Sequence, residues 1–123
     1  MTNPTAIFKE LFRRSDSGEK IGLDVDAADF TRGLGDVFEL IASQLMPQIQ
    51  EREGQWYDGV VNLVVTHRKP RQFEFTGEMW VAQGTEQWKE DFRARVTDKR
   101  TTRQGFAIVL WIGADRVETS LFE

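Results

Sequence analysis

The sequence contains no cysteine and only one histidine, His67. The absence of cysteine excludes disulfide bonds, thiolate catalysis and zinc sites with cysteine ligands. A single histidine is too few for a histidine-based metal site, and the cationic neighbours Arg68 and Lys69 favour its neutral form. We therefore expect no metal, no cofactor and no catalytic residues, and the chain is interpreted as a protein without enzymatic activity.

Other catalytic motifs are also missing. No phosphate-binding loop, dinucleotide fingerprint or nucleophile elbow occurs in the sequence. Asp24, Asp26 and Asp29 form an acidic cluster, but the glycine and the distant glutamate of a calcium-binding loop are absent. Helix capping explains this cluster better than ion binding.

The chain also lacks an excess of positive charge and a long apolar run. Its formal net charge is −4, so no global positive field would attract nucleic acid or an anionic membrane. No apolar run approaches the ~18 residues that a membrane span needs, and residues 1–4 do not open a secretory signal. We expect a cytoplasmic protein with no membrane contact, and nucleic acid is not the partner that we predict.

What the sequence does contain is typical of one compact domain. It has 123 residues, of which 40% are hydrophobic and 29% are charged. A chain of this length needs most of its apolar residues for a single core. Residues 1–123 are therefore predicted to form one α+β domain.

Two helices are predicted in the N-terminal part of the chain. Asn3 and Pro4 are typical of a helix start, and the apolar residues that follow recur at helical spacing as far as Arg14. A second helix is predicted to begin at Asp26 or Asp29 and to end or kink at Pro47. Between them, residues 21–26 alternate in polarity, which indicates a short edge strand or an extended linker.

The rest of the chain predicts an antiparallel β-meander of four to five strands. The segments are rich in Val, Ile, Phe and Trp and are separated by turn residues. Short connections favour pairing in chain order, with the two helices packed on one face of the sheet. The predicted segments are Trp56–Thr66, Arg71–Gln83, Glu86–Asp98, Gln104–Ile112 and Arg116–Phe122.

Alternation along the strands assigns side chains to the two sheet faces, provided that no bulge intervenes; Gly77 is the position where we expect one. The face toward the helices is predicted to hold Phe73, Phe75, Met79, Val81, Trp88, Phe92, Ala94, Val96, Phe106, Ile108, Leu110 and Ile112. The opposite face is predicted to hold Glu74, Thr76, Glu78, Trp80, Lys89, Asp91, Arg93, Arg95, Ala107, Val109 and Trp111. If the first strand keeps the same register, Trp56, Val60, Asn62, Val64 and Thr66 join the opposite face.

Three of the four tryptophans, Trp56, Trp80 and Trp111, thus share the face without a helix, beside Arg93 and Arg95. An aromatic patch on a solvated sheet face is typical of an interface, and tryptophan is enriched at binding hot spots. The alternative is that Trp80 and Trp111 stabilise neighbouring strands, with Glu and Arg side chains bridging around them.

Two basic loops form a second candidate surface, because the first and third hairpin loops of a meander lie at the same end of the sheet. These loops contain His67, Arg68, Lys69, Arg71, Lys99, Arg100 and Arg103. A basic pole of this kind suits an acidic protein surface, a phosphate or a nucleic acid. The alternative is that the loops are charged for solubility, and they contain no aromatic residue of the kind that nucleic-acid sites interleave with basic residues.

Two functions are compatible with these features. The first is a protein-binding domain, of inhibitor, immunity, adaptor or chaperone type, that docks on another protein or on a second copy of itself through the aromatic face or the basic pole. The second is a small-ligand-binding or small enzymatic domain with a pocket between helices and a curved sheet, as in NTF2-like and cystatin-like layouts. Such a pocket would be lined by Phe73, Met79, Trp88, Phe92 and Phe38, with Tyr57 or His67 as polar groups.

Overall fold

The computed structural model describes residues 4–16, 25–50, 55–69 and 71–122. Its helices are α1 (Pro4–Asp16) and α2 (Val25–Gln50), and a single 3₁₀ turn, η1, spans Arg100–Thr102. Its strands are β1 (Gln55–Lys69), β2 (Gln72–Gln83), β3 (Glu86–Asp98), β4 (Phe106–Ile112) and β5 (Asp115–Leu121).

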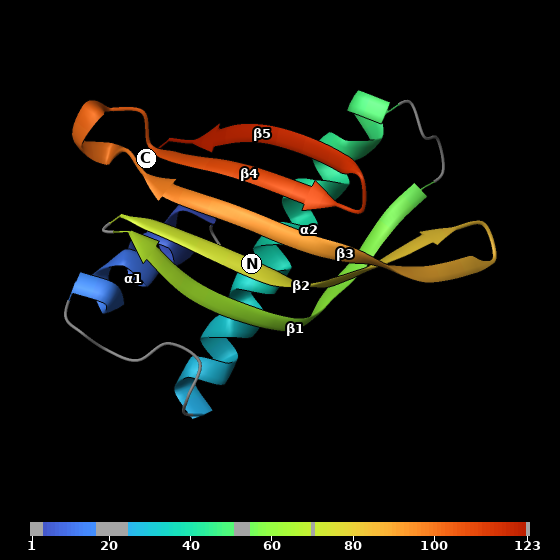
Figure 1. The fold of residues 1–123 in the computed structure, drawn as a ribbon, viewed down its shortest axis with the longest axis horizontal. Helices are drawn as coiled ribbons and strands as arrows, with labels where there is room; N and C mark the ends of the chain where they lie inside the picture. The colour runs from blue at the N-terminus through green and yellow to red at the C-terminus, as the bar shows by residue number, and fades with distance from the viewer. Residues whose placement is uncertain (1–3, 17–24, 51–54, 70, 123) are drawn as a thin grey trace.

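The five strands form one antiparallel sheet in the order β1-β2-β3-β4-β5, and both helices lie on the same face of it (Figure 1). The predicted α+β meander with two N-terminal helices on one face is therefore confirmed. Residues 21–24 of the predicted edge strand or linker lie outside the described residues, and Val25 begins α2.

Helix α2 is longer than the sequence predicts. It begins at Val25 and continues through Pro47 to Gln50, so of the two predicted outcomes at Pro47, an end or a kink, the end is wrong. Pro47 has no backbone N–H to donate within the helix. Because only three helical residues follow it, the loss of this one hydrogen bond destabilises little of the helix. Neither of the described helices combines the length and the apolar composition needed to cross a membrane.

The helices bury apolar side chains that are spaced three and four residues apart. In α2 these include Leu34, Val37 and Phe38, all at most 1% exposed. Phe38 lies at the centre, with ring centroids 6.0 Å from Phe8 of α1 and 4.9 Å from Phe75 of β2. Each such aromatic pair contributes about 0.5–1.5 kcal/mol beyond its buried area, so Phe38 ties both helices to the sheet.

Helix α1 also carries a local charge pair on its solvent side. The carboxylate of Glu10 accepts hydrogen bonds from Arg13 at 2.6 Å and from Arg14 at 3.0 Å. These hydrogen bonds, first from Arg13 and then from Arg14, lower the pKa of Glu10 to about 2. Because the pair is largely exposed, it adds little to stability.

The predicted inner face of the sheet is confirmed, with one residue less buried than predicted. All of its predicted members are buried except Trp88, which is half-buried and packs against the edge of the core. The phenylalanines of α1, α2 and the sheet contact one another, which leaves the centre of the domain solid. The core therefore occupies the space between the two helices and the middle of the sheet.

Strand β1 departs from simple alternation. Its register with β2 shifts between Tyr57 and Val60, between Val61 and Val64 and between His67 and Lys69, so each interval contains one extra residue in β1. Gly59 and Asn62, at φ 113° and 56°, lie within the first two of these bulges. The bulge predicted at Gly77 of β2 is therefore wrong, because the extra residues belong to the neighbouring strand.

Gly77 still marks the place where β1 comes close. A Cβ at this position would lie 2.8 Å from the backbone oxygen of Val61, so a side chain has no room there.

The bulges also turn Val60 to the inner face, opposite Met79, which corrects its predicted place on the outer face. Val64 and Thr66 pair with outer-face positions of β2 as predicted. The amide of Asn62 donates to Glu78 at 3.2 Å, on the outer side as expected.

Candidate functional site

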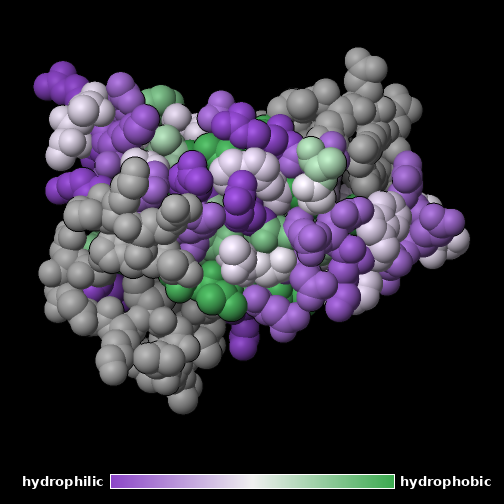
Figure 2. Space-filling view, viewed as in Figure 1, coloured by the Kyte–Doolittle hydropathy of each residue, from purple (hydrophilic) through white to green (hydrophobic). Residues whose placement is uncertain are grey.

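The outer face of the sheet is the face that the described helices leave uncovered. Figure 2 views the molecule from this side and shows hydrophilic side chains over most of the sheet, with paler and hydrophobic side chains between them. Of the three tryptophans assigned to this face, Trp56 is 45% exposed, whereas Trp80 and Trp111 are half-buried. The indoles of Trp80 and Trp111 are therefore partly covered by their neighbours.

Trp111 lies under three arginines, which we call the Arg–Trp cluster: Arg93, Arg95, Trp111 and Arg116. The guanidinium carbon of Arg93 is 4.0 Å from the indole centroid, that of Arg95 is 5.5 Å away and that of Arg116 is 5.7 Å away. Antiparallel pairing produces this arrangement, because Trp111 of β4 pairs with Arg93 on one side and with Arg116 on the other. Cation–π contacts of this kind hold the indole and the guanidinium groups in fixed positions relative to each other.

The arginines of the cluster differ in how close a carboxylate comes to them. Arg116 binds Glu118 at 2.8 Å, and Arg93 is 3.9 Å from Glu74. The Nε atom of Arg95 is buried and has no hydrogen-bond acceptor in the described part of the chain. A buried donor without an acceptor costs about 1–3 kcal/mol. The cluster thus holds a guanidinium whose hydrogen-bonding capacity the described residues do not fill.

Trp80 has a similar but smaller environment. The ammonium of Lys89 is 5.5 Å from its ring centroid and 3.9 Å from a carboxylate oxygen of Glu78. This arrangement agrees with the alternative interpretation that Trp80 stabilises the β2–β3 pair. Trp56 and Val64, both in β1, are the large apolar side chains of this face that are well exposed.

The two loops of the predicted basic pole lie next to each other at one end of the sheet. The backbone N–H of Asp98, at the end of β3, donates to the carbonyl of Arg71 at 2.8 Å, which brings the two loops together. Lys99 and Arg103 are exposed at this end. The backbone of His67, Arg68 and Lys69 belongs to β1, but their side chains lie outside the description.

Two arginines of the pole, Arg71 and Arg100, form salt bridges with Asp98, a residue that the sequence analysis did not identify. The side chain of Asp98 is fully buried and accepts hydrogen bonds from Arg71 at 3.0 Å and from Arg100 at 2.8 Å. Burial alone would raise the pKa of Asp98, but hydrogen bonds from Arg100 and the charges of Arg100 and Arg71 together lower it. Alternation was the signal that could have found Asp98, because Asp98 continues the inner-face series of Ala94 and Val96 and pairs with Phe106.

A shallow cavity of about 290 Å³ lies at the same pole, lined by Arg100, Arg103, Gly105 and Phe122. The guanidinium of Arg100 is already held by Asp98, so Arg103 is the lining cation that extends into solvent. The pole is therefore less basic than the sequence predicts.

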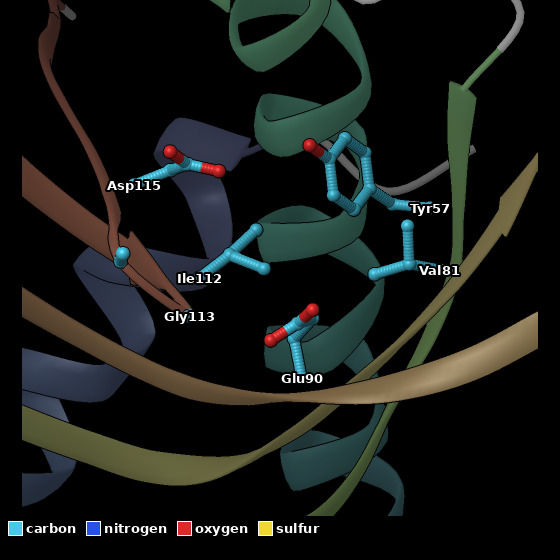
Figure 3. Close-up of a pocket in the computed structure, with 7 residues that line it drawn as sticks. Tyr57, Val81, Glu90, Ile112, Gly113 and Asp115 are labelled. Carbon is cyan, nitrogen blue, oxygen red and sulfur yellow. The ribbon is translucent and has the colours of Figure 1, made fainter.

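The apolar residues that the sequence predicts to line a pocket between helices and sheet do not line one. Phe38, Phe73, Met79 and Phe92 are at most 2% exposed and fill the dry core. A cavity of about 230 Å³ opens instead beyond the end of β4, lined by Tyr57, Val81, Glu90, Ile112, Gly113, Ala114 and Asp115 (Figure 3). Tyr57 is a predicted polar group of the pocket, whereas Glu90 and Asp115 were not predicted. We call this space the end cavity.

No protein family, curated protein or solved structure was found to match this chain. In the described ranges, no group of three or more histidine, cysteine, aspartate or glutamate side chains is placed to hold a metal ion. The candidate surfaces therefore have to be judged on their own geometry.

Proposed function

We propose that the chain is a non-enzymatic protein-binding domain whose outer sheet face docks on a protein with an acidic surface. The Arg–Trp cluster carries this proposal. It combines the two residue types that dominate binding hot spots, and it presents them on a sheet face that no described element covers.

The charges of the cluster favour an acidic partner. Three guanidinium groups surround one indole, with Glu74 and Glu118 as the neighbouring carboxylates. A carboxylate supplied by a partner would pair with the exposed guanidinium groups of the cluster, such as those of Arg93 and Arg116, and would form charge-assisted hydrogen bonds in a partly desolvated place. An inhibitor, an immunity protein or an adaptor would use a rigid sheet face in this way.

A protein partner explains the face better than nucleic acid does. The outer face carries Glu74, Glu78, Asp91 and Glu118 among its basic residues, and the whole chain has a net charge of −4. Because basic and acidic side chains alternate on this face, it fits a protein surface whose acidic groups lie opposite the arginines better than a phosphate backbone that is negative along its whole length. The absence of cysteine fits a protein that works in a reducing cytoplasm.

Replacing Arg95 with glutamine is expected to weaken binding of an acidic probe peptide, Glu-Glu-Phe-Glu-Glu, by roughly 10- to 100-fold, since it removes a charged hydrogen-bond donor. Trp111→Ala is expected to weaken it at least as much. Affinity is measured by isothermal titration calorimetry at low salt, where surface charge interactions are least screened.

Arg103→Gln is the matched control, because it makes the same charge change at the exposed basic pole. It should leave the affinity unchanged. Equal loss in the Arg95 and Arg103 variants, or equal binding of a Lys-Lys-Phe-Lys-Lys peptide, would show that the cluster is not the docking site. Tighter binding of single-stranded DNA would assign the face to nucleic acid. A dimer that forms through this face without an acidic partner would assign it to a second copy of the chain.

A further inference from the structure

The end cavity lies on the inner side of the sheet, away from the Arg–Trp cluster, and exists because neighbouring strands differ in length. Strand β4 ends at Ile112, which pairs with Phe92, so the preceding residues of β3 have no β4 partner. Glu90 therefore projects from β3 beside the turn that joins β4 to β5. Tyr57 approaches from β1 and Asp115 from the start of β5 (Figure 3).

The polar ends of three side chains meet around this space. Figure 3 shows the carboxylates of Glu90 and Asp115 and the hydroxyl of Tyr57 at its margin, with the apolar side chains of Val81 and Ile112 between them. Tyr57 is only 4% exposed, so its ring forms a wall of the cavity and is not a surface group. None of the lining residues in the described part of the chain is basic.

The carboxylate of Glu90 is held in place from two sides. The indole N–H of Trp88, on the same strand and the same face, donates to it at 2.9 Å. Gly113, at φ 60°, leaves the space that the carboxylate occupies, because a Cβ there would lie 2.7 Å from its Oε2 atom. The backbone N–H of Gly113 donates to the carbonyl of Asp91 at 2.8 Å and fixes the turn. Glu90 is thus oriented before any ligand arrives.

The chemistry of the lining identifies one class of ligand. Two carboxylates and a phenol hydroxyl accept hydrogen bonds from an ammonium or a guanidinium group, and an aromatic wall attracts the same cation. The volume of about 230 Å³ lies just below the range of drug-sized pockets, so the ligand is small. The aliphatic lining by Val81 and Ile112 suits a short apolar body attached to the cation.

We propose that the end cavity binds a small organic cation, an amine or guanidine with a short aliphatic body, with Glu90 as its charged anchor and Tyr57 as its aromatic wall. This site is separate from the docking face, because inner and outer residues of β3 alternate. Glu90 and its neighbour Asp91 lie on opposite faces of the sheet, which provides a matched pair of variants.

The test compares n-butylamine, butyrate and butan-1-ol, which share size and chain length but differ in charge. The ligands are titrated at constant ionic strength into ¹⁵N-labelled protein, and shifts of Gly113 and of the Trp88 indole N–H are followed. Butylamine is expected to bind with a dissociation constant on the order of 1 mM, given the limit on binding energy per ligand atom. Butyrate and butanol are expected to cause no saturating shift at the same concentrations.

Glu90→Gln keeps an acceptor for the indole of Trp88 but removes the charge, and it should weaken butylamine binding roughly 10- to 100-fold. Asp91→Asn makes the same charge change on the outer face and should leave the affinity unchanged. Tyr57→Phe keeps the ring and should have a smaller effect than Glu90→Gln.

The proposal is overturned if butylamine gives no saturating shift in the folded wild-type protein, if butyrate binds as well, or if Asp91→Asn weakens binding as much as Glu90→Gln. An unchanged near-ultraviolet circular dichroism spectrum confirms that each variant is folded. Arg95→Gln is expected to bind butylamine normally, so failure of this site and failure of the docking face are distinguishable.

Discussion

Replacing both Arg71 and Arg100 with methionine is expected to lower the free energy of unfolding at pH 7 by about 3–5 kcal/mol. The two arginines are partly exposed, whereas the side chain of Asp98 that they hold is fully buried. Among the donors that the structure describes, their removal would leave this buried carboxylate with the backbone N–H of Arg100 alone, at 3.0 Å. Methionine keeps much of the aliphatic volume, so the loss reflects the charge and not the packing.

The sign of the pH dependence separates this effect from a general loss of stability. In the wild-type protein the pKa of Asp98 is lowered, so its contribution is present above the pKa of the unfolded state, about 4, and is lost as the pH falls through the folded value. In the double variant, burial, which is the largest influence on the pKa of Asp98, is opposed among the described donors by the backbone N–H of Arg100, and the pKa should be raised. The variant should therefore gain stability as the pH falls from 7 toward 5, whereas the wild-type protein should not.

Guanidinium chloride unfolding at pH 7 and pH 5 measures both effects. Arg103→Met, which changes an exposed cation of the same pole, is the control and should change stability by less than about 0.5 kcal/mol. Adding Asp98→Asn to the double variant should restore part of the stability at pH 7. Equal losses at both pH values, with no recovery from Asp98→Asn, would contradict the role assigned to Asp98.

Phe38→Ala is expected to lower the free energy of unfolding by about 3–5 kcal/mol. Phe38 is fully buried, and its ring contacts Phe8, Phe75 and Phe92 at centroid distances of 6.0, 4.9 and 5.4 Å. The cost combines the lost transfer energy of the ring with a cavity that the rigid strands cannot close. Thermal or chemical unfolding followed by circular dichroism measures it.

Leu40→Ala, on the same helix, is the control for Phe38→Ala. Leu40 is 43% exposed, so its truncation should cost less than about 1 kcal/mol. If the two substitutions were equally costly, the orientation of α2 on the sheet would be wrong, and with it the assignment of inner and outer faces on which both proposed sites depend.

The strand pattern and the faces of β2, β3 and β4 were predictable because these strands pair without interruption. Their partners run in continuous register from Gln72 to Gln83 and from Phe92 to Asp98. Strand β1 was not predictable in the same way. The first two of its three bulges depend on positive φ values at Gly59 and Asn62, which local sequence permits but does not require. The placement of Val60 failed for this reason.

The candidate sites also divide into one that the sequence predicted and one that it did not. Arg93, Arg95 and Trp111 were assigned to one face by alternation alone, and the structure places them in one cluster. The end cavity was missed because it depends on β4 being shorter than β3, and on a turn at Gly113 that makes room for Glu90. Strand lengths and turn geometry are set by tertiary contacts, so a pattern of residue types does not locate such a cavity.

The measurement that tests the docking proposal most directly is a ¹⁵N chemical-shift titration of the whole protein with the Glu-Glu-Phe-Glu-Glu peptide. The largest shifts are expected at the indole N–H of Trp111 and at the amides of Arg93 and Arg95, and they should diminish with added salt. Shifts confined to Lys99, Arg103 and the rest of the basic pole, or no saturating shift on the outer face, would contradict the account.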